Sequence, residues 1–164
     1  MITVVIATHD SAPSLGTCLA SLVPAAVDGL VREVVIADAG SGDATLAIAE
    51  DCGARIVRNP GNAGIRLAVG CEDPRGDWLL VLEPDAVLPE GWRATVETHL
   101  AGGPDRAATL PVYPARGWAR LLGLERLQGL LISTRLYTAT GGFRPGERAL
   151  ADLARASRAR RLRW

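Results

Sequence analysis

Short apolar runs alternate with stretches of helical periodicity along the first half of the chain. Each run ends at polar residues or at a turn, as a buried parallel strand ends at its carboxyl side. The runs are residues 2–7, 33–37 and 78–82, and a further predicted strand at 54–58 turns at Asn59. Between them apolar residues recur at helical spacing, as Leu15, Leu19 and Leu22 do after Pro13. This alternation predicts an α/β fold with a mainly parallel, Rossmann-like sheet and helices on both faces.

The second half of the chain is less regular. We predict a helix from residue 89 to about 100, a strand at 107–112, an apolar helix at 118–127 and a strand at 128–133. Gly141 lies in a loop, and we expect an Arg-rich helix from there to the C-terminus. Ser41 or Asp43 is the expected N-cap of the helix after the second strand. Without repeats or low-complexity segments, the pattern indicates one domain over residues 1–164.

Polar side chains stand at the ends of three predicted strands. Thr8 and Asp10 follow the first strand, Asp38 ends the second, and Glu83 and Asp85 follow the fourth. Because carboxyl ends of parallel strands meet in one crevice, we expect these groups to share a site. Asp38 can accept hydrogen bonds from a base or ribose, while Glu83 and Asp85 offer oxygens to Mn²⁺ or Mg²⁺ on a diphosphate. Taken singly, each residue also has a structural interpretation, as a helix cap or turn former.

Composition bears on the partners and the cellular location that we expect for the protein. The formal charge is zero at pH 7 and all 18 basic residues are Arg, so the overall balance predicts no nucleic-acid partner. Three cysteines without metal-like spacing argue against a complete disulfide framework and favour a reducing cytoplasm. The apolar start is too short for a signal peptide, and no apolar run reaches the length of a bilayer span.

Six segments of the chain resemble the successive motifs of family-2 glycosyltransferases with a GT-A fold. They are VVIATHD at 4–10, DAGSGDAT at 38–45, NAG at 62–64, RGDWLLVLEPD at 75–85 and, more weakly, GGF at 141–143 and DLAR at 152–155. The segment at 38–45 is the most specific. The resemblance implies that Thr8 and Asp38 hold the nucleotide base and ribose and that Asp85 binds the metal. It also implies transfer of a sugar, with inversion, from a nucleoside diphosphate sugar to an acceptor hydroxyl.

Within that family the chain looks most like the short bacterial glycosyltransferases grouped with arsenosugar biosynthesis. Residues 1–100 would then form the nucleotide-binding half and residues 101–164 the acceptor-side half. Arg66, beside the turn at Asn62, can reach a diphosphate, with plain surface exposure as the alternative. His9 in the first loop either approaches the nucleotide or is simply solvated.

The C-terminus is strongly basic. It can rest on an anionic membrane at the inner face, where a lipid-linked acceptor would be found, with a solvated tail as the alternative. The residues concerned are Arg155, Arg158, Arg160, Arg161, Leu162, Arg163 and Trp164.

Two departures from the family pattern bear on activity. Glu83 stands where the metal motif has Asp, which keeps a carboxylate on a longer side chain. Ala149 and Leu150 stand where the family has Glu-Asp, the Asp being the general base that deprotonates the acceptor. Leucine cannot take a proton, and loss of a positioned base costs about 10²–10⁴-fold in rate. Glu147 or Asp152 can replace it only if the loop is rearranged.

Two functions therefore stay open from the sequence. One is a metal-assisted glycosyltransferase, and the other is a nucleotide-sugar-binding module or scaffold that has lost turnover. A nucleotidyltransferase is a weaker third class, because no Gly-rich loop with a following Lys comes after the first strand.

Overall fold

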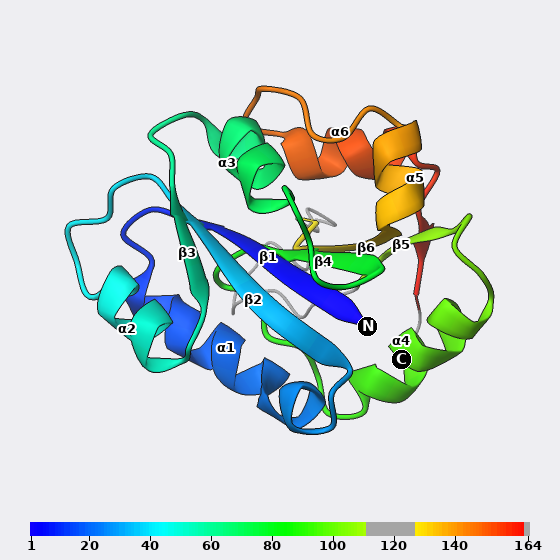
Figure 1. Cartoon of the computed structure of the whole chain (residues 1–164), viewed down its shortest axis with the longest axis horizontal. Coiled ribbons are helices and arrows are strands. Elements are labelled where there is room, and N and C mark those ends of the chain that lie inside the picture. Colours follow the sequence, from blue (N-terminus) through cyan, green and yellow to red (C-terminus); the bar gives the residue numbers. More distant parts are fainter. Residues whose placement is uncertain (111–126, 163–164) are drawn as a thin grey trace, which may run out of the picture.

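The computed structural model describes residues 1–110 and 127–162 of the chain. The described strands form one seven-stranded sheet in the order β3-β2-β1-β4-β6-β5-β7 (Figure 1). The strands are β1 (Ile2–Thr8), β2 (Val31–Asp38), β3 (Arg55–Arg58), β4 (Trp78–Leu82), β5 (Ala107–Thr109), β6 (Gly129–Ser133) and β7 (Arg160–Arg161). The helices are α1 (Ala12–Val27), α2 (Thr45–Asp51), α3 (Ala63–Gly70), α4 (Trp92–Ala101), α5 (Thr134–Ala139) and α6 (Ala149–Ala156).

The sheet is mainly parallel, as predicted. Strands β3, β2, β1 and β4 run in one direction. Among the described strands only β6 is reversed, because it pairs antiparallel with both β4 and β5, while β7 pairs parallel with β5. The register sets Thr8 opposite Asp38 and Ile6 opposite Leu82. The carboxyl ends of β1, β2 and β4 therefore meet at one edge of the sheet.

Helices cover both faces of the sheet because successive side chains of a strand point to opposite sides. In β1, Val4 packs with Leu15 of α1 in one core, and its neighbour Val5 packs with Leu67 of α3 in the other. Helices α1, α2 and α4 lie on the first face, and α3, α5 and α6 lie on the second (Figure 1). The predicted α/β architecture is thus confirmed.

The start of α2 differs from the prediction. The N-cap position is Ala44, and no side chain caps the helix there. Asp43, one residue earlier, accepts 2.9 Å from Thr45 N with one oxygen and 3.0 Å from Ala12 N, at the start of α1, with the other. The Ser41 hydroxyl instead donates a hydrogen bond to Asp38 at the end of β2. Both side chains serve contacts between loops, which a rule based on one helix does not foresee.

The other differences lie after β6. The sequence pattern does not predict α5, whose N-cap Ser133 accepts a hydrogen bond of 3.1 Å from Leu136 N. The prediction of an Arg-rich helix that reaches the C-terminus is wrong. Helix α6 ends at Ala156, Arg158 adopts a left-handed φ of 52°, and the chain continues as β7 beside β5.

Other predictions fall on the undescribed part of the chain. Residues 118–126 of the predicted apolar helix and residues 111–112 of the predicted strand lie outside the described residues. Within residues 1–110 and 127–162, no helix is long and apolar enough to cross a membrane.

Candidate active site

Thr8 and Asp38 lie side by side where β1 and β2 end. The Thr8 hydroxyl donates a hydrogen bond of 2.8 Å to Asp38 Oδ1, and both side chains are buried. The same carboxylate accepts 2.5 Å from Ser41 Oγ, 2.8 Å from Ser41 N and 2.8 Å from Gly40 N. Asp38 is 0% exposed. Its acceptor positions are therefore filled by donors from its own chain.

These donors decide the charge of Asp38. Burial alone would raise the pKa of this carboxyl group, because desolvation disfavours the charged form. The hydrogen bonds from Ser41, Thr8 and Gly40 outweigh burial and lower the pKa of Asp38 below its usual value. Asp38 is thus an ionised acceptor at the strand ends. A ligand can bond to its oxygens only by displacing one of the four donors.

Asp10 ties the loop after β1 to the loop after β2. Its backbone N donates 2.9 Å to Ser41 Oγ, and its Oδ1 accepts 2.8 Å from Gly42 N. Asp10 adopts a left-handed φ of 47°, which Asp tolerates better than most residues. The exposed Asp10 side chain thus links the two loops, and its contact with a nucleotide stays a prediction.

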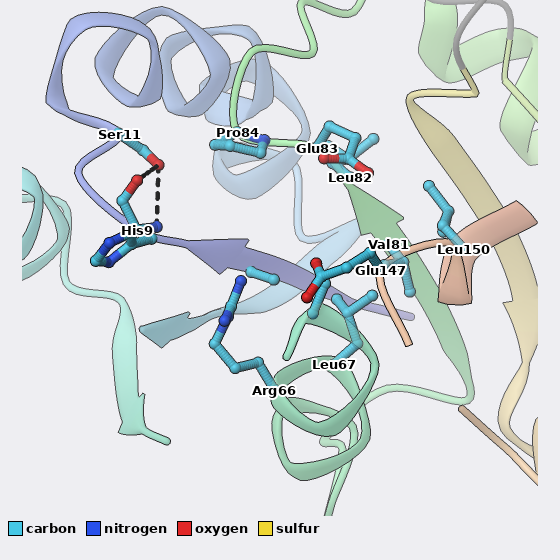
Figure 2. Close-up of a pocket in the computed structure, with 12 residues that line it drawn as sticks. His9, Ser11, Arg66, Leu67, Val81, Leu82, Glu83, Pro84, Glu147 and Leu150 are labelled. Carbon is cyan, nitrogen blue, oxygen red and sulfur yellow. Dashed lines mark hydrogen bonds between the residues drawn. The ribbon is translucent and has the colours of Figure 1, made fainter. Parts of the chain in front are cut away.

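A cavity of about 210 Å³ lies beside the carboxyl ends of β1 and β4 (Figure 2). It brings together three predicted site residues: Glu83 from the end of β4, Arg66 from α3 and Glu147 from the loop before α6. The full lining is Ala7, His9, Ser11, Ala63, Arg66, Leu67, Val81, Leu82, Glu83, Pro84, Glu147 and Leu150. Five other predicted site residues are not part of this lining: Thr8, Asp10, Asp38, Asp85 and Asp152.

Arg66 brings a positively charged side chain to this cavity. One guanidinium nitrogen donates 2.5 Å to the carbonyl oxygen of Gly61, which fixes the side chain against the turn before α3. Its Nε is buried and has no hydrogen-bond partner. Buried donors are normally paired. The Arg66 side chain also places a positive charge beside the strand-end crevice, which fits an anionic ligand.

His9, which the sequence allows either to approach the nucleotide or to be simply solvated, lines the cavity. Its backbone N donates 3.2 Å to Ser11 Oγ, and the same hydroxyl donates 3.2 Å back to the His9 carbonyl (Figure 2). This pair of bonds fixes the loop directly after β1. In the sequence, the signal for a role of His9 in the site is its position alone, because His9 is the first residue beyond the end of β1.

Glu83 and Asp85 are the carboxylates that follow β4, and both are half-buried. A turn holds them, because Glu83 N donates 2.9 Å to the Gln128 carbonyl and Ala86 N donates 3.0 Å to the Glu83 carbonyl. Asp85 lies near the Cys18 thiol, whose pKa is raised to about 12 by burial and then by the Asp85 charge.

The described residues contain no group of three or more His, Cys, Asp or Glu arranged to hold a metal ion. Glu83 and Asp85 supply two carboxylates directly after β4, and Mg²⁺ commonly takes one or two carboxylates together with substrate phosphates and water. Their role as metal ligands stays a prediction.

The position expected for the general base is occupied by Leu150, which is buried in α6 and lines the cavity. Glu147, in the loop before this helix, lines the same cavity (Figure 2). Asp152 belongs to a different depression, together with Arg144 and Arg155, and it accepts 3.3 Å from Arg155 Nη1. Of the two candidate substitutes for the base, only Glu147 lies at the cavity.

Comparison with solved structures finds the same fold in glucosyl-3-phosphoglycerate synthase from Mycobacterium tuberculosis. Its complex with Mn²⁺, uridine diphosphate and glucosyl-3-phosphoglycerate matches with a TM-score of 0.71 and 24% identity, covering 98% of this chain and 69% of that one. Its complex with phosphoglyceric acid matches with a TM-score of 0.73 and 23% identity, over 98% and 69% of the two chains. The fold is therefore of the GT-A type.

A search of curated proteins finds no match. The resemblance to the arsenosugar group stays a prediction. The sequence of residues 3–142 does match the family model described as Glycosyl transferase family 2. Because this match spans most of the chain, the protein belongs to glycosyl transferase family 2.

Proposed function

We propose that this protein transfers a sugar from a nucleoside diphosphate sugar to an acceptor hydroxyl, assisted by a divalent metal. The observation that carries the proposal is the cavity where Glu83, Arg66 and Glu147 meet beside the ends of β1 and β4. It offers the carboxylate of Glu83 at the end of β4, the cation of Arg66 and a second carboxylate from Glu147. These are the groups that a diphosphate leaving group and an acceptor hydroxyl require.

On the donor side, Thr8 and Asp38 would hold the base or ribose. Ser41 is only half-buried, so its hydroxyl is the donor that a nucleotide N–H or O–H can replace most easily at Asp38. Arg66 would place its positive charge beside the diphosphate, and Asp10 would keep the two nucleotide loops together. Neutralising the diphosphate in this way stabilises charge that grows as the leaving group departs.

On the metal side, Asp85 and Glu83 would hold Mn²⁺ or Mg²⁺. A metal bound there supplies positive charge to the departing diphosphate. The M. tuberculosis enzyme is solved with Mn²⁺ and uridine diphosphate, which supports extending this class of donor and metal to the present chain.

On the acceptor side, Glu147 would accept the proton of the attacking hydroxyl. The oxygen then attacks the anomeric carbon from the side opposite the diphosphate, so the carbon inverts. Asp152 is the weaker candidate because it bonds Arg155 and does not line the cavity.

A turnover assay tests this proposal. The protein is incubated with UDP-glucose or GDP-mannose, Mn²⁺ and a panel of hydroxyl acceptors that includes phosphoglycerate, and release of the nucleoside diphosphate is measured. Acceptor-dependent release that needs the metal supports transfer. Tight donor binding with no release for any acceptor would favour the second candidate.

That second candidate is a nucleotide-sugar-binding module without turnover. It is favoured by one observation, the apolar Leu150 at the wall where the family has its base. Contact of the exposed Arg158, Arg160 and Arg161 with an anionic membrane stays a prediction, as does a cytoplasmic location. Co-sedimentation with phosphatidylglycerol vesicles tests the membrane contact.

A further inference from the structure

The N-terminus of α3 is joined to the loop that carries Glu147. The Asn62 side chain caps this helix by accepting 3.2 Å from Ile65 N, and the same oxygen accepts 2.9 Å from Gly146 N. Gly64 N donates 2.9 Å to the carbonyl oxygen of Gly146. Both backbone groups of Gly146 are therefore bonded to α3, and the next residue is Glu147.

The two segments are also tightly packed at this junction. Gly64 is buried, and a Cβ added to it would lie 2.0 Å from the Arg144 carbonyl oxygen and 2.9 Å from Gly146 N. No side chain larger than hydrogen fits there without moving the loop. Gly146 itself has a φ of 150°, a conformation that residues with a side chain rarely adopt.

Helix α3 also carries Arg66, which lines the cavity together with Glu147 (Figure 2). Arg66 comes two residues after Gly64 on the same rigid helix. The junction therefore fixes the loop that carries the Glu147 carboxylate relative to the helix that carries the Arg66 cation. Glu147 itself is exposed, so burial in the core does not hold its side chain.

We propose that Asn62 and Gly64 are positioning residues, which latch the 144–147 loop onto α3 and so hold Glu147 in the cavity that Arg66 also lines. Their catalytic importance rests on the proposed function, whereas the latch itself does not. The latch explains how a carboxylate outside α6 can serve a site whose usual base position is Leu150. A misplaced catalytic group can lose about 10²-fold in rate for a shift of about 1 Å.

The test combines hydrogen exchange with kinetics. In Asn62→Ala, Gly146 N loses its acceptor, so we expect faster amide exchange in residues 144–147. We expect kcat to fall about 10–100-fold while the dissociation constant of the nucleoside diphosphate stays within about threefold of the parent value. Asn62→Asp keeps an oxygen acceptor for both amides and should restore slow exchange and most of kcat. Gly64→Ala should behave like Asn62→Ala.

Two controls separate the latch from loss of stability. Ser133→Ala removes the N-cap of α5, a helix-cap loss of the same kind, because the Ser133 hydroxyl bonds Leu136 N and the Pro104 carbonyl and not residues 144–147. Gly16→Ala adds a methyl group to a helical glycine with nothing within 4 Å of the new Cβ. Neither control should change exchange at 144–147 or the kcat.

The outcomes are distinct. Parental exchange at 144–147 in both Asn62→Ala and Gly64→Ala would overturn the latch, whatever the activity. Faster exchange with unchanged kcat would overturn the positioning role while leaving the transferase intact. If the parent protein binds donor but shows no turnover, the proposed function fails, and the exchange comparison still decides whether α3 holds the loop.

Discussion

Glu147 and Leu150 line one cavity from either side of the point where α6 begins. Leu150 comes from the helix and Glu147 from the loop that precedes it. The carboxylate of Glu147 therefore lies at the same cavity as Leu150, the residue at the expected base position. The chain retains an acid at this wall although the family's acidic position has become apolar.

The first prediction concerns this acid. Glu147→Gln keeps the shape of the side chain but cannot take a proton, so turnover should fall about 10²–10⁴-fold. Nucleotide binding should be unchanged, as measured by calorimetry. Asp152→Asn is the matched control, because it removes a carboxylate of the next depression and should leave turnover within about twofold. The assignment is wrong if Asp152→Asn abolishes turnover and Glu147→Gln does not.

The second prediction is a rescue. In the Glu147→Gln protein, Leu150→Asp should return a base to the same wall and raise turnover by about tenfold or more. The new charge replaces a buried apolar side chain, so unfolding free energy should drop by on the order of 3 kcal/mol. Leu153→Asp controls for this cost, since Leu153 is buried on α6 but does not line the cavity. A folded, donor-binding double variant with no gain in rate would contradict the prediction.

The third prediction concerns acid stability. The pKa of Asp38 is lowered in the folded protein, while in the unfolded chain it is about 3.9. Its ionised form therefore stabilises the fold fully above about pH 5, and this contribution is lost as the pH falls through the folded value. Asp38→Asn should cost on the order of 2 kcal/mol at pH 7 and progressively less below about pH 4.

Urea unfolding of the parent and of Asp38→Asn at several pH values measures this difference. Glu33, whose pKa is also lowered, contributes to the same pH range in both proteins and cancels in the comparison. A difference that stays constant down to pH 2.5 would show that the charge of Asp38 is not what the four donors stabilise.

The fourth prediction concerns Arg66. Arg66→Ala should weaken binding of a nucleoside diphosphate about tenfold or more, because a charge-assisted bond to phosphate is lost. Binding of the nucleoside alone should not change. Arg55→Ala is a suitable control, since Arg55 pairs with Glu33 at 3.3 Å and does not line the cavity. Equal losses for nucleoside and nucleoside diphosphate would place Arg66 away from the phosphates.

The strand ends were predictable from the sequence because their signal is local. The apolar run of β1 ends at Thr8 and that of β2 at Asp38, and the parallel arrangement that brings them together follows from alternation with helices. The helices on both faces follow from the same alternation, whereas the glycosyltransferase motifs rest on resemblance to a known family.

The interactions around these ends were not predictable, because they depend on contacts between distant loops. Ser41 matches an N-cap signal, yet its hydroxyl bonds Asp38. Asp10 bonds Gly42 across two loops. The choice between Glu147 and Asp152 likewise depends on where α6 begins and which of its sides meets the cavity. Spacing along the sequence leaves both possibilities open.

The most direct test of the account is calorimetric titration with UDP and GDP, with and without Mn²⁺, of the parent protein and two variants. We predict that one nucleotide binds and that Mn²⁺ tightens binding by about tenfold, or about 1.4 kcal/mol. Asp85→Ala should lose this metal-dependent gain, and Asp38→Ala should weaken binding under both conditions. Absence of binding to either nucleotide, with and without Mn²⁺, would contradict the account.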